Sequence, residues 1–128
     1  MPVRSLNSPV FKWPDRKIVH QALLEWVKKK AQERPELLRA GYFGSYARGD
    51  WGVSSDLDLI LILDHSEVNF QERATEWDVT SLPVPVDILI YTEEEWLALA
   101  ERGDRFYKTI EEEAVWIFYS SNSTVASA

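Results

Sequence analysis

The sequence has no cysteine and only two histidines, His20 and His65. Without cysteine the chain forms no disulfide bond and offers no thiolate ligand for zinc. Two histidines are too few for a histidine-rich metal centre, and we interpret both as surface or helix-packing residues. Any metal ion must therefore be held by carboxylates, whose hard oxygen atoms favour magnesium or manganese.

Long apolar runs and an excess of basic residues are also missing. No hydrophobic stretch approaches the roughly 20 residues that span a bilayer, and Arg4 is followed by no sustained apolar core of the kind that a secretory signal carries. We therefore expect a cytoplasmic protein that does not enter a membrane. The net charge of −7 argues against extended nucleic-acid binding, because nonspecific affinity comes largely from basic residues that displace counterions.

What is present is the composition of a soluble globular domain. The chain has 128 residues, of which 45% are hydrophobic and 27% charged, enough to bury a continuous core. We expect a single domain over residues 1–119. The small polar residues of 120–128 indicate a disordered tail.

Periodicity and turn residues predict alternating helices and strands. Apolar residues recur at the helical spacing between Asp15 and Arg34, where Pro35 ends the pattern. Thr92 followed by three glutamates is typical of a capped helix start rather than a metal site. Further helices are expected at 45–48, 69–79 and 103–112, and strands at 37–43, 57–63, 84–91 and 114–119. The strand at 57–63 is apolar on both faces, which indicates a central position in a sheet.

The most informative segment is 44–50, which reads Gly-Ser-Tyr-Ala-Arg-Gly-Asp. The first amides of a helix have no partner within the helix, so a Gly-Ser turn at a helix start offers N–H groups and the Ser45 hydroxyl to an anion. Asp56 and Asp58 follow at the entrance to an apolar strand, where side chains two residues apart share a face. A third acid, Asp87, interrupts another apolar run.

Mutual repulsion gives these acids a reason to bind metal. Two carboxylates about 4 Å apart repel by roughly 4 kcal/mol at an effective dielectric of 20, so such a pair shares a proton or recruits a cation. Three carboxylates on neighbouring strands would suffice for two ions, and a pair of ions can clamp the attacking and leaving oxygens of a phosphoryl transfer. The alternative is that Asp56 and Asp58 cap the strand and that Asp87 points into water.

These residues resemble the nucleotidyltransferase superfamily that includes DNA polymerase beta, and most closely its minimal nucleotidyltransferase branch. In that family a Gly-Ser helix turn precedes an Asp-x-Asp strand, and a third acid lies on a later strand. The resemblance implies that Asp56, Asp58 and Asp87 bind two magnesium or manganese ions and carry the catalysis, with Asp87 helping to deprotonate the attacking hydroxyl. It implies that Gly44 and Ser45 hold the phosphates of the nucleotide.

The resemblance also implies a fold and an activity. The fold is α/β (α+β), a small mixed β-sheet packed with helices on one side. The activity is the magnesium-dependent transfer of a nucleoside monophosphate, AMP from ATP, onto a hydroxyl. The minimal branch implies an antitoxin whose partner is a HEPN-type helical toxin. Two alternatives stay open: a module that masks its partner by contact without transfer, and nucleotidyl transfer to a small molecule. The oligomeric state, homo-oligomer or hetero-oligomer, is not specified by these residues.

Several side chains near the motif have two interpretations. Arg48 lies three residues after Ser45, on the same helix face, where it can contact either a phosphate or an acidic neighbour. Tyr46 and Trp51 either stack on a base or ribose or belong to the packing, and Tyr91 either lines the pocket or belongs to the packing. Of the six tryptophans, Trp26 and Trp116 fall on core-like faces, while the pattern assigns no position to the others, which are Trp13, Trp51, Trp77 and Trp96.

Overall fold

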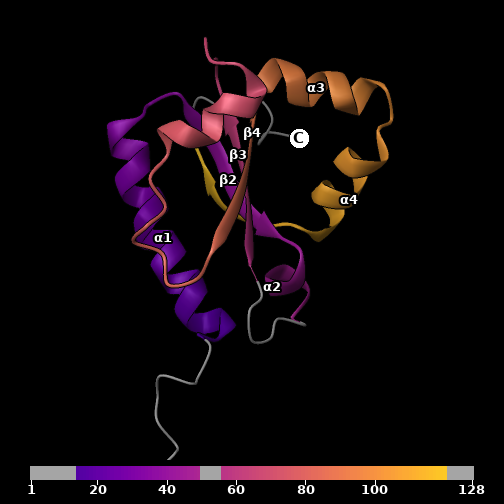
Figure 1. Ribbon diagram of the computed structural model, residues 1–128. Helices are drawn as coiled ribbons and strands as arrows, with labels where there is room; N and C mark the ends of the chain where they lie inside the picture. Colours follow the sequence, from indigo (N-terminus) through magenta and orange to yellow (C-terminus); the bar gives the residue numbers. More distant parts are fainter. Residues whose placement is uncertain (1–13, 50–55, 121–128) are drawn as a thin grey trace, which may run out of the picture.

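The computed structural model describes residues 14–49 and 56–120, in which the strands form one mixed sheet in the order β4-β3-β2-β5 (Figure 1). The strands are β2 (Leu37–Phe43), β3 (Leu57–Leu63), β4 (Val86–Thr92) and β5 (Val115–Tyr119). The helices are α1 (Arg16–Glu33), α2 (Ser45–Arg48), the 3₁₀ helix η2 (Phe70–Glu76), α3 (Glu93–Glu101) and α4 (Arg105–Glu113). β2 pairs antiparallel with β3 and β5, and β3 pairs parallel with β4.

The central strand β3 is buried on both sides. Its odd-numbered leucines, from Leu57 to Leu63, belong to the core cluster that contains the apolar face of α1. The side chains that point to the opposite face, Ile60 and Ile62, belong to a second cluster with Trp96 of α3 and Ile110 of α4. A strand with apolar residues on both faces needs cover on both. The sheet is therefore sandwiched between α1 and the pair α3 and α4, as Figure 1 shows.

The predicted fold class, α/β with a mixed sheet, is confirmed. The placement of the helices differs from the expectation. The resemblance implied helices on one side, whereas the structure places them on both. The predicted bounds of β2, α2 and β3 coincide with those observed. Helix α1 begins after Asp15, whose side chain accepts a hydrogen bond of 3.0 Å from the amide of Ile18.

The segment after β3 is a 3₁₀ helix held by a buried arginine. Arg73 is 5% exposed and donates hydrogen bonds to the carbonyls of Val68, at 2.8 Å, and Ile90, at 3.0 Å. Its guanidinium also binds Glu95 of α3, at 2.6 Å and 3.0 Å. Because a buried guanidinium requires partners, these bonds fix the connection between β3 and β4 against the sheet. The helix expected at 69–79 is observed as the shorter 3₁₀ helix η2 (Phe70–Glu76).

The start of α3 has the capping chemistry that the sequence predicts. The Thr92 hydroxyl accepts a hydrogen bond of 3.2 Å from the amide of Glu95, and the Glu95 carboxylate accepts one of 2.9 Å from the amide of Thr92. This reciprocal pair satisfies two amides at the helix start. Glu95 therefore belongs to helix capping, as expected, and Glu93 and Glu94 lie with it in the first turn of α3.

The tryptophans that the pattern left unassigned divide into two groups. Trp77 and Trp96 are buried, with 3% and 0% of their surface exposed. Trp13 and Trp51 lie outside the described residues, as do the tail residues 121–128. No helix in the described parts of the chain is both long and apolar enough to cross a bilayer.

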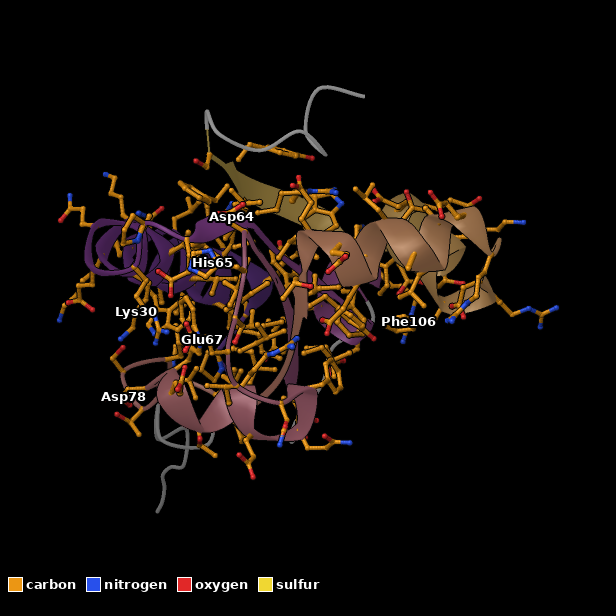
Figure 2. The ribbon with its side chains drawn as sticks, turned by 90° about the horizontal axis from the view of Figure 1, so that it is seen from above. Lys30, Asp64, His65, Glu67, Asp78 and Phe106 are labelled. Atoms are coloured by element: carbon orange, nitrogen blue, oxygen red, sulfur yellow. The ribbon has the colours of Figure 1, made fainter. Side chains whose placement is uncertain are left out.

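The two histidines lie away from the acidic motif. His65 is exposed at the far end of β3, where its Nδ1 atom lies 3.1 Å from the carboxylate of Asp64 (Figure 2). His20 of α1 packs against β2, with its Nδ1 atom 2.9 Å from the hydroxyl of Tyr42. Both positions fit the expected surface and packing roles.

Candidate active site

The turn between β2 and α2 lies directly against an acid of β3. Phe43, the last residue of β2, is the register partner of Asp58, so the chain turns at Gly44 beside the entrance of β3. Gly44 has φ 76° and ψ −150°, a conformation that L residues rarely adopt. A Cβ atom at Gly44 would overlap the carboxylate of Asp58 and would lie 3.2 Å from its Cγ atom. Only glycine allows this approach.

Asp58 and Asp87 are register partners across the parallel strands β3 and β4. Paired residues of adjacent strands project from the same face of a sheet, and this face is the one that α3 and α4 cover farther along the strands. Asp56 lies two residues before Asp58. Burial raises the pKa of the Asp58 carboxyl, repulsion by Asp87 and Asp56 raises it further, and the charge of Arg48 opposes the rise. The structure thus brings the three predicted acids together.

The acids do not form a closed metal-binding group. Within residues 14–49 and 56–120, no set of three or more histidine, cysteine, aspartate or glutamate side chains is arranged to hold a metal ion. Asp56 and Asp87 are exposed, whereas Asp58 is half-buried. A shared ion would therefore require carboxylates of this set to change position. The donor set itself suits a hard divalent cation, because a cation would relieve the repulsion that raises the pKa of Asp58.

A fourth acid, Glu113, lies at this site and was not predicted. It is the last residue of α4, and its Oε1 atom accepts a hydrogen bond of 3.2 Å from the Gly44 amide. The same oxygen lies 3.4 Å from Nη1 of Arg48. Of the two interpretations of Arg48, the structure shows the contact with an acidic neighbour. The only hint in the sequence was the acidic run 111–113 at a helix C-terminus, where the helix dipole disfavours negative charge.

An ion pair between a buried arginine and a half-buried glutamate fixes the C-terminal turn of α4 against the sheet. Arg39 of β2 is 3% exposed, and its two terminal nitrogens donate hydrogen bonds to the two oxygens of Glu111, each at 3.2 Å. Trp96 donates a further bond of 2.9 Å to Glu111, and the guanidinium of Arg39 lies 3.7 Å from the centroid of the Trp116 ring. Burial raises the pKa of Glu111, but the hydrogen bonds from Arg39 and Trp96 outweigh it and hold the pKa below its usual value.

The remaining candidates have distinct environments. Ser45 begins α2 and is half-buried. Tyr46 is fully buried, with its hydroxyl 3.4 Å from the carbonyl of Pro14, so its ring belongs to the packing. Tyr91 lies at the other end of β4 from Asp87, where its ring packs against those of Phe70, Trp96 and Phe106.

Comparison with known proteins agrees with this architecture. A family model described as a nucleotidyltransferase domain matches residues 24–117. A search of curated proteins gave no match. Among solved structures, a protein from Sulfolobus solfataricus that is assigned as a nucleotidyltransferase is 21% identical, with a TM-score of 0.59 over 84% of this chain and 86% of that one.

Two further structures come from toxin–antitoxin systems. One is a toxin–antitoxin with AMP-PNP, 18% identical with a TM-score of 0.54, and the other is a mutant of the toxin–antitoxin MntA-HpeT, 15% identical with a TM-score of 0.52. Each alignment covers 77% of this chain and 74% of the other. At these identities the likeness shows the fold alone.

Because the family match spans well over half of the 128 residues, including the Gly44 turn and all three acids, the chain belongs to the nucleotidyltransferase domain family.

Proposed function

We propose that this chain is a magnesium-dependent nucleotidyltransferase that moves AMP from ATP onto a hydroxyl of a protein partner, a HEPN-type helical toxin that it neutralises as an antitoxin. The observation that carries the proposal is the placement of the register pair Asp58 and Asp87 beside the Gly44 turn. A pair of acids beside a strand-to-helix turn of the Gly-Ser kind, which can bind phosphate through its amide, is the arrangement that nucleotidyl transfer needs.

The residues divide the work between phosphate and acceptor. Gly44 and Ser45 would bind the triphosphate through a backbone amide and a hydroxyl, and Arg48 would balance its charge. Asp56, Asp58 and Asp87 would hold magnesium, which when bound neutralises charge on the phosphates. The exposed Asp87 carboxylate would take the proton of the acceptor hydroxyl. The acceptor oxygen then bonds to the α-phosphorus, and pyrophosphate leaves with the electrons of the broken bond.

Two observations support a protein as the acceptor. Asp56 and Asp87 are exposed, so that a side chain presented by a large partner can reach them. Two solved structures with this fold are toxin–antitoxin proteins, one of them with AMP-PNP. We transfer both the partner class and the adenine nucleotide to this chain as part of the proposal.

The test is a transfer assay with the purified chain, labelled ATP, magnesium and, as candidate partner, the product of any neighbouring gene. Mass spectrometry of the partner should show an added AMP, and Asp58→Asn and Asp87→Asn should each abolish it. Asp64→Asn is the matched control, since this exposed acid lies just beyond the opposite end of β3 and should leave transfer unchanged (Figure 2). Unmodified partner in the wild-type reaction, with the toxin still neutralised, would contradict the transfer reaction.

The same assay separates the other acceptor classes. If Asp56→Asn and Asp58→Asn proteins neutralise the toxin as well as the wild type does, contact rather than catalysis explains the effect. A labelled adduct on a small molecule, with an unlabelled partner, would instead assign the acceptor to the small-molecule class.

A further inference from the structure

Glu113 contacts the two donors that a phosphate would bind under the proposed function. Its Oε1 atom is shared by the amide of Gly44, at 3.2 Å, and the guanidinium of Arg48, at 3.4 Å. The Gly44 amide lies on the strand-to-helix turn against Asp58, and Arg48 is the last residue of α2, the helix that follows this turn. A side-chain carboxylate thus takes the place that the proposed function gives to the triphosphate.

The helix that carries Glu113 is held in place independently of this contact. Two residues earlier, Glu111 binds the buried Arg39 and Trp96, which anchors the last turn of α4 to β2 and α3. The amide of Ala114 closes the helix on the carbonyl of Ile110 at 2.9 Å. Glu113 can therefore leave Gly44 by rotating its own side chain, which is 26% exposed, without moving the helix.

The contact between Glu113 and Gly44 also has a clear physical reason. Gly44 is buried, and a buried amide without an acceptor costs free energy. A negative charge at the end of α4 opposes the helix dipole, so Glu113 depends on donors outside its helix. The Gly44 amide and the Glu113 carboxylate therefore each supply the partner that the other needs. A phosphate and Glu113 exclude each other at this amide.

We propose that Glu113 competes with the triphosphate for the Gly44 turn. The Glu113 carboxylate binds the Gly44 amide until a nucleotide displaces it. This inference rests on the proposed function, since it needs a phosphate at Gly44. The displaced Glu113 rotates into solvent, and the phosphate takes over the Gly44 amide and the charge of Arg48. The competition lowers the apparent affinity of the wild-type chain for triphosphate.

The test is a titration of the ¹⁵N-labelled full chain with inorganic tripolyphosphate and with ATP, in which the Gly44 amide is followed by NMR. Removing a charge-assisted contact should tighten binding by about three- to tenfold in Glu113→Gln and Glu113→Ala. Glu112→Gln is the matched control, because this exposed neighbour changes the net charge equally and should leave the dissociation constant unchanged. The spectra also report whether each variant is folded.

Three results would overturn the inference. Equal or weaker binding by both Glu113 variants would mean that Glu113 supports the turn instead of competing for it. Equal tightening by Glu112→Gln would assign the effect to long-range charge. No binding of either anion by any of the proteins would leave no phosphate for Glu113 to exclude. Normal binding without any AMP transfer would contradict only the proposed function.

Discussion

The backbone of Gly44 lies so close to the carboxylate of Asp58 that no side chain fits between them. The contact joins the turn that we propose for phosphate with an acid that we propose for metal. Glycine is needed at this position for two reasons. Its φ is positive, and a Cβ atom would overlap the Asp58 carboxylate. A change at Gly44 should therefore affect the site and the fold together.

Replacing Gly44 by alanine should push Asp58 away from the turn. We expect AMP transfer to fall about 100-fold and the free energy of unfolding to fall by more than about 2 kcal/mol. The control is Gly49→Ala at the other end of α2, where φ is also positive but a Cβ would meet nothing within 4 Å. That variant should lose only about 1 kcal/mol and keep its activity. Urea melts give the stability of each variant, and mass spectrometry gives its AMP transfer. Similar losses of transfer in the two variants would contradict the close-contact account.

Replacing Asp58 by asparagine should stabilise the fold while it removes activity. Burial and the charges of Asp87 and Asp56 raise the pKa of Asp58, so its charged form is disfavoured in the folded chain at neutral pH. Asparagine keeps the shape and removes that cost. Urea unfolding at pH 7 with a chelator present should show a higher midpoint for Asp58→Asn than for the wild type. A lower midpoint would mean that Asp58 makes a stabilising contact that outweighs the repulsion.

Replacing Glu111 by glutamine should weaken the anchor of α4 in a pH-dependent way. The variant leaves the buried Arg39 without its counter-charge, which should cost about 2 kcal/mol at pH 7. The folded pKa of Glu111 lies below its ordinary value of 4.5, so its contribution is present above pH 4.5 and is lost as the pH falls through the folded pKa.

The measurement is urea unfolding of Glu111→Gln and wild type at several pH values. The difference in stability should shrink below pH 4.5, the ordinary pKa of the carboxyl. Glu112→Gln, in the same helical turn, is exposed and should change stability by less than about 0.5 kcal/mol at any pH. A constant difference between Glu111→Gln and wild type across the acidic range would show that the charge of Glu111 does not hold the anchor.

The parts of the structure that sequence predicted are those with local causes. The bounds of α2 follow from Gly44 and Gly49, which mark its two ends. Thr92 caps α3 through a residue three positions away. The two-sided apolar pattern of 57–63 predicted a central strand, and it also required cover on both faces, which the expectation of helices on one side overlooked.

The parts that sequence did not predict depend on contacts between distant residues. Glu113 meets Gly44 across 69 positions of the chain, and Arg39 meets Glu111 across 72. No spacing rule connects such pairs before the sheet order is known. The proximity of the acids was predicted because Asp56 and Asp58 share a strand face, but their exposed, unclosed arrangement depends on side-chain positions that no pattern specifies.

The most direct test of the central claim is a Mn²⁺ titration of the chain followed by electron paramagnetic resonance, in which bound manganese loses the signal of the free ion. We expect the wild type and Asp64→Asn to bind Mn²⁺, and the Asp58→Asn, Asp87→Asn double variant to bind none. Undiminished binding by the double variant would contradict a metal site at the carboxylates that β3 and β4 bring together beside Gly44.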